Sequence, residues 1–122
     1  MTARTAAIVL GIVFIVVGIL GFFNNPVIGI FGVNAAHNIV HLASGAFLLI
    51  GAFTPLGSGL ALKILGVIYA IIAILGFIIV GEDMMMLGII MVDVADKWLH
   101  VVLAIVLLIA GFGLPDEERR AV

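Results

Sequence analysis

All three histidines of this 122-residue chain lie in two short polar segments that resemble each other. The spacing His37-x-x-x-His41 places two imidazoles on one face of a helix, and Asp96-x-x-x-His100 does the same for a carboxylate and an imidazole. Three imidazoles and one carboxylate are a suitable ligand set for zinc, copper or ferrous iron. His37, His41, Asp96 and His100 are therefore candidate ligands of a transition metal.

Two other interpretations of these residues stay open. His41 and His100 each lie seven residues into their expected helices, about 10 Å below the start, and could be the axial ligands of a b-type haem. Alternatively, the two rings hydrogen-bond to each other and to Asn38 or Asp96, and so hold the second and fourth helices together at about 0.6–2 kcal/mol per bond. We take this structural clamp as the leading interpretation.

The other polar residues of the two segments suit the beginning of a helix. Asn34 and Asp93 each precede an apolar helical run, and both residue types are favoured N-caps. Asp96 is then the third helical residue, as in a capping box, and Asp93 has the i, i+4 spacing of an ion pair with Lys97. We expect Lys97 to be a charge at the membrane rim and Trp98 to be an interfacial anchor.

Methionines and one tyrosine supply the remaining candidate groups. The run Met84–Met86 and Met91 could add thioethers to the imidazoles, a combination that suits Cu(I), although we interpret them as apolar filler. Tyr69 falls near the middle of an apolar run and needs a partner for its hydroxyl group. Ser44, at a similar depth, is the expected partner.

The rest of the chain is close to hydrocarbon in character. Hydrophobic residues make up 66% of it and charged residues 10%, against about 25% charged residues in soluble domains. Four apolar runs are long enough to cross a bilayer, which takes about 20 helical residues. They are Ala6–Phe23, Ala35–Phe53, Gly59–Val80 and Val94–Phe112. We therefore predict a single domain, residues 1–122, that is an all-α integral membrane four-helix bundle in contact with lipid.

An internal repeat divides this bundle into residues 6–53, the first repeat, and residues 59–112, the second repeat. The informative matches are glycines and polar residues, because apolar residues match by chance. Glycines 11, 21 and 29 match 66, 76 and 88, and polar residues 34 and 41 match 93 and 100. Each repeat contains two spans, so both have the same orientation in the membrane. Residues 27–33 and 87–92 are too short to span and are expected to cover the histidines.

The polar motifs also resemble a known family. The pattern Val-Asn-x-x-His-Asn-x-x-His-Leu, followed later by Asp-x-x-Asp-x-Trp-Leu-His, resembles small bacterial four-helix membrane proteins classified only as a domain of unknown function. The resemblance covers nearly the whole chain. It implies the four-helix topology and points to the same His and Asn/Asp positions, but it implies no activity.

Charge and composition limit where the protein can be located and what it can bind. The basic residues other than Lys97 lie at one end of the predicted topology; they are Arg4, Lys63, Arg119 and Arg120. The positive-inside rule then places both termini in the cytoplasm, in what the resemblance indicates is a bacterial plasma membrane, with the histidines on the outer side. No basic stretch suggests nucleic acid, and no catalytic constellation suggests an enzyme. We expect a structural or accessory protein that forms a homo-oligomer or joins a larger membrane complex. The alternative is a metal-binding or haem-binding membrane protein that acts in transport, sensing or electron transfer.

Overall fold

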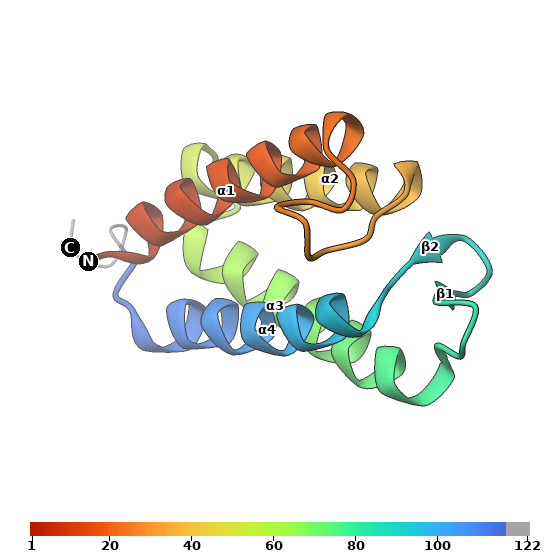
Figure 1. Cartoon of the computed structure of the whole chain (residues 1–122). Helices are drawn as coiled ribbons and strands as arrows, with labels where there is room; N and C mark the ends of the chain where they lie inside the picture. Colours follow the sequence, from red (N-terminus) through yellow and green to blue (C-terminus); the bar gives the residue numbers. More distant parts are fainter. Residues whose placement is uncertain (117–122) are drawn as a thin grey trace.

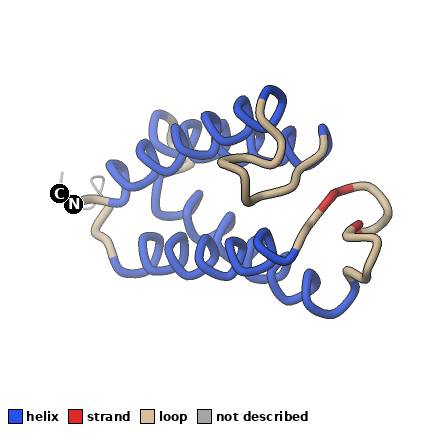
Figure 2. Tube along the Cα trace, viewed as in Figure 1, coloured by secondary structure: helices blue, strands red, loops and turns tan. Residues whose placement is uncertain are grey.

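A computed structural model describes residues 1–116 and contains four long helices with a small strand pair between the last two (Figures 1 and 2). The elements are α1 (Ala3–Phe23), α2 (Ala35–Phe53), α3 (Ser58–Ile79), β1 (Met85–Met86), β2 (Ile90–Met91) and α4 (Val94–Gly113). All four helices are long and apolar enough to cross a membrane. The predicted all-α membrane bundle is confirmed, and α1 begins three residues earlier than expected.

Side-chain caps determine where three of the helices begin. The Thr2 hydroxyl accepts a hydrogen bond from the amide of Thr5, and the Asn34 side chain accepts one from the amide of His37. Asp93 and Asp96 form the expected capping box at the start of α4. The N-cap predictions for Asn34 and Asp93 are therefore confirmed, and each cap satisfies a backbone amide that has no partner within its helix.

The helices pack as two hairpins. α1 lies mainly against α2, and α3 lies mainly against α4, while α3 connects the hairpins by contacts with α1 and α2 (Figure 1). Small residues allow the close approach within the first hairpin, because a Cβ on Gly45 would meet the Gly11 carbonyl oxygen at 2.5 Å. Large apolar side chains such as Ile12, Ile71 and Ile105 remain exposed on the outer faces, where they contact the lipid bilayer.

The turns before α2 and before α4 have matching backbone conformations. Ile28 and Gly29 have φ values of 49° and 72°, and Leu87 and Gly88 have values of 54° and 70°. A single bridge between Val27 and Phe31 closes the first turn, and the β1–β2 pair closes the second. These likenesses favour the proposed repeat, whose division at residues 6–53 and 59–112 stays a prediction.

The two ends of the bundle differ in what they hold. The start of α1 and the end of α4 lie together at one end, where the amide of Ala3 donates to the carbonyl of Pro115 at 3.0 Å (Figure 1). The two turns lie at the opposite end, next to the starts of α2 and α4. The polar segments that contain the histidines are therefore gathered at the turn end.

Candidate functional site

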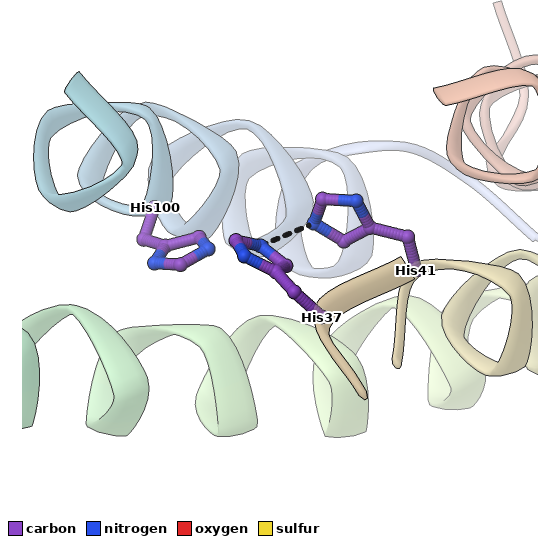
Figure 3. A group of neighbouring side chains, drawn as sticks. All are labelled: His37, His41 and His100. Carbon is purple, nitrogen blue, oxygen red and sulfur yellow. Dashed lines mark hydrogen bonds between the residues drawn. The ribbon is translucent and has the colours of Figure 1, made fainter. Parts of the chain in front are cut away.

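The three histidines meet inside the turn end of the bundle. His37 and His41 extend from α2 and His100 extends from α4, and one ring nitrogen from each lies within 4.8 Å of the others (Figure 3). All three side chains are buried. The ring centroids of His37 and His41 are 4.5 Å apart, and those of His37 and His100 are 5.6 Å apart. Three of the four predicted metal ligands thus form one cluster.

Hydrogen bonds indicate which nitrogen carries the proton in the rings of His37 and His41. Nδ1 of His37 lies 2.6 Å from the Met91 carbonyl oxygen, which only accepts, so the proton of His37 is on Nδ1. Nε2 of His37 then accepts from Nε2–H of His41 at 3.1 Å (Figure 3). Nδ1 of His41 is left as a buried acceptor, and no residue of the described chain donates to it.

Two aromatic rings form a wall beside the histidines. Phe14 makes an edge contact with His41 at 5.9 Å between centroids, and Tyr69 makes one with His100 at 5.8 Å. The hydroxyl groups of Tyr69 and Ser44 are 2.9 Å apart, as predicted. Because Ser44 donates to the Val40 carbonyl oxygen, the Tyr69 hydroxyl is the donor in this pair.

A small cavity of about 20 Å³ lies at the centre of this arrangement. A void of roughly 10–15 Å³ is enough for one water molecule, whereas small-molecule sites occupy about 300–1,000 Å³. The cavity therefore accommodates a single ion or water and has no room for a porphyrin, so the haem interpretation does not fit. Its lining residues are His37, Val40, His41, Tyr69, Ile72, Met86, Ile90, Val92 and His100.

Asp96 and Asn38 take positions other than those predicted for the site. Among residues 1–116, the close ligand group contains the three histidines and not Asp96, which uses Oδ2 to accept from the amide of Asp93. Asn38 packs against α1, where a Cβ on Gly21 would collide with its amide group. Within the described chain, Oδ1 of each residue is buried without a hydrogen-bond partner. The predicted pairing of either residue with His41 or His100 is therefore wrong.

A clamp between the two halves does exist, and the N-cap residues and the turns contribute to it together with the bond from His37 to the Met91 carbonyl oxygen. The side-chain NH₂ group of Asn34 donates to the Ile89 carbonyl oxygen at 2.8 Å, and the backbone amide of Gly32 donates to Oδ2 of Asp93 at 2.7 Å. Burial acts to raise the pKa of Asp93, but hydrogen bonds from the amides of Asp96 and Gly32, with contributions from the Asp96 side chain and His37, act in the opposite direction and the pKa is lowered. Each helix start is thus tied to the turn of the other repeat.

Lys97 and Trp98 lie at the edge of the site. The Lys97 ammonium donates to the Val80 carbonyl oxygen at 3.3 Å, and no ion pair in the described chain joins it to Asp93, so the predicted i, i+4 pair is not formed. Trp98 is 61% exposed and makes an edge contact with Phe77. Its place near the turn end is compatible with the predicted interfacial role.

Met86 is a site residue that the sequence did not single out. It packs with Val80 and Val92 as apolar filler would, and β1 also places it against the histidine cavity, where it is only 4% exposed. The signal available was the methionine run itself. Nothing in that run distinguishes Met86 from Met84 or Met85, because only the turn determines which of the three points inward.

Comparison with known proteins confirms the predicted kind of family. The family described as a domain of unknown function, DUF4383, matches residues 4–113 and so covers all four helices. No curated protein and no solved structure matches the chain. This small polytopic membrane protein therefore belongs to the DUF4383 family, whose function is unknown.

Proposed function

We propose that this protein is a binding protein, and not an enzyme, that holds one transition-metal ion between His37, His41 and His100. The observation that carries the proposal is the convergence of three buried ring nitrogens within 4.8 Å of one another. In a tetrahedral site with metal–nitrogen bonds of about 2.0–2.1 Å, neighbouring nitrogens are about 3.3 Å apart. The Nε2 atoms of His37 and His41, 3.1 Å apart, are already close to this spacing.

The surroundings of His37 support the same proposal. A metal-binding imidazole usually donates its second N–H to a carbonyl or carboxylate, which fixes the ring and its tautomer. Nδ1–H of His37 makes this kind of bond to the Met91 carbonyl oxygen. Nδ1 of His41 can take up the proton that now lies between the two rings, because it is an acceptor without a donor in the described chain. Both Nε2 lone pairs would then be free to bind an ion.

We also propose the orientation predicted from the sequence, with both termini in the cytoplasm of a bacterium and the histidines toward the outer side. Its support is the position of the described basic residues. Arg4 stacks on Phe53 and Lys63 stacks on Phe112, both at the end where α1 begins and α4 ends. Lys97 lies at the other end. Arg119 and Arg120 are outside the described residues.

Self-association, or membership of a larger complex, stays a prediction with less support than the sequence suggested. Small residues allow helices of separate chains to approach closely. Gly18 and Gly76 pack inside the chain, where a Cβ on Gly18 would meet Leu42 and one on Gly76 would meet Lys97, so neither is available for such a contact.

Metal content and thermal melting of gently purified protein test the proposed function. We expect the parent to retain close to one equivalent of metal, and its melting temperature to rise with added Zn²⁺, Co²⁺ or Cu⁺, because an ion that binds only the folded state stabilises it. His41→Gln and His100→Gln should lose this response. Tyr69→Phe is the matched control, because it removes a polar group beside the same cavity but no imidazole, and it should keep the response.

The structural clamp predicts a different pattern in the same experiment. If the rings only hold the helices together, no metal should raise the melting temperature of the parent, and Gln should replace His with a loss of about 1 kcal/mol or less. That outcome would eliminate the metal-binding proposal.

Labelling of introduced cysteines tests the orientation, since the chain has no cysteine of its own. Glu82→Cys, in the exposed loop at the turn end, should react with a membrane-impermeant thiol reagent in intact cells. Thr2→Cys should react only after permeabilisation. The reverse pattern would invert the orientation while leaving the metal-binding proposal unaffected.

A further inference from the structure

The second turn brings a thioether to the histidine cavity. Met86 pairs with Ile90 across the β1–β2 hairpin, and both residues line the cavity together with the three histidines. The carbonyl of Met91, the next residue of β2, is the hydrogen-bond acceptor for His37. The hairpin therefore holds Met86 and the imidazole cluster in one rigid unit.

The opening opposite Gly76 shows how the fold admits this side chain. A Cβ on Gly76 would lie 3.9 Å from Cε of Met86, so α3 offers a surface with no side chain where the end of Met86 rests. Met85 is half-buried and not part of the cavity lining. Adjacent residues of a strand point to opposite faces, so Met86 alone of the pair faces the histidines.

The electrostatics of the cavity favour a small charge. Its lining residues among those described include no carboxylate, and Asp96 lies outside the ligand group. The cost of transferring an ion from water to a low-dielectric interior rises with its charge, so a monovalent ion bound by neutral ligands meets a smaller penalty there than a divalent ion.

We propose that the site selects Cu(I), bound by His37, His41 and His100 with the thioether of Met86 as the fourth ligand. This inference rests on the proposed function and adds the identity of the ion. Thioether ligands are soft and select Cu(I), and imidazole is compatible with copper. Softness and charge therefore point to the same ion, because Cu(I) is the monovalent ion among those that imidazole sites hold.

Competition for metal with a chromogenic chelator, under anaerobic reducing conditions for Cu(I), tests this identity. The parent should hold Cu(I) more tightly than Zn(II). Met86→Leu keeps the volume and removes the sulfur, and we expect it to weaken Cu(I) binding by about tenfold or more while leaving Zn(II) binding nearly unchanged. Met85→Leu is the matched control and should leave the affinity for both metals unchanged.

The outcomes separate this inference from the proposed function. A parent that binds no metal overturns both. A parent that prefers Zn(II), or Met86→Leu and Met85→Leu variants with equal Cu(I) affinity, overturns the Cu(I) site alone and leaves a three-histidine site. X-ray absorption at the copper edge of the loaded parent needs no variant to fold. A sulfur scatterer is expected, and nitrogen or oxygen scatterers alone would overturn the role of Met86.

Discussion

The two repeats share a pair of contacts at the centre of the molecule. In the first repeat the edge of Phe14 meets His41 at 5.9 Å, and in the second Tyr69 meets His100 at 5.8 Å. Phe14 and Tyr69 also contact each other, with centroids 5.3 Å apart. The aromatic–histidine pairs thus face one another across the boundary between the repeats, and they show what both copies of the hairpin have in common.

Two other matched positions differ in chemistry. His37 of the first repeat corresponds to Asp96 of the second, and Val27 of the first turn corresponds to Met86 of the second. His37 points across to the other repeat, whereas Asp96 accepts a bond from its own N-cap. The two hairpins therefore place different side chains at matched positions, and together they form one asymmetric cluster.

Substitution of His37 should have the largest effect, because it should remove the response of the melting temperature to metal. His37→Gln removes a ligand and should abolish the metal-dependent rise in melting temperature, a stabilisation of about 2.7 kcal/mol when free metal is 100-fold above Kd. Asp96→Asn keeps an oxygen that can accept from the Asp93 amide, and it should preserve the rise. Melts with and without metal measure both. Loss of the response in Asp96→Asn would mean that the carboxylate is a ligand and that the repeats do not differ as described.

Gly21 and Gly76 occupy matched positions, and their substitution by alanine should change the stability of the bundle by different, smaller amounts. A Cβ on Gly21 would collide with the buried amide group of Asn38, whereas one on Gly76 would lie 3.6 Å from Lys97, an ordinary contact. Gly21→Ala should therefore destabilise the bundle by about 1–3 kcal/mol. Gly76→Ala should be neutral or stabilising by up to about 1 kcal/mol, since Ala favours helix. Denaturant unfolding in detergent measures the difference, and equal losses would contradict it.

The N-cap residue Asp93 should give the smallest difference in stability, and it should be visible only at acidic pH. Burial acts to raise the pKa of Asp93, but hydrogen bonds from the Asp96 and Gly32 amides are among the interactions that keep it below its ordinary value of 3.8. A carboxyl whose folded pKa is lowered stabilises the fold above its unfolded pKa, and this contribution is lost as the pH falls through the lower, folded value. Asp93→Asn should therefore flatten the dependence of melting temperature on pH below about 4. Asn34→Asp should instead destabilise the bundle at neutral pH, because its carboxylate cannot donate to the Ile89 carbonyl oxygen as the Asn34 side chain does. An unchanged slope in Asp93→Asn would show that this cap does not respond to pH.

Local chemistry made much of this structure predictable. A segment in lipid must satisfy its own backbone hydrogen bonds, so apolar length alone indicated four helices. Capping depends on residues within one turn of each other, which is why Asn34, Asp93 and Asp96 could be placed from the sequence. The pair formed by Ser44 and Tyr69 was also predictable, because two buried hydroxyl groups at equal depth need partners.

Helix spacing determined that His37, His41, Asp96 and His100 lie on two helix faces, but the rotation of each helix about its axis depends on packing. The close fit of Asn38 against Gly21, and the ties from each N-cap to the opposite turn, set that rotation. They bring His37 and His100 together and leave Asp96 outside the ligand group. The inward placement of Met86 likewise depends on where the hairpin closes. The sequence by itself thus determined the helices, their caps and the gathering of polar groups at one end, and the tertiary structure alone decided which of those groups share a cavity.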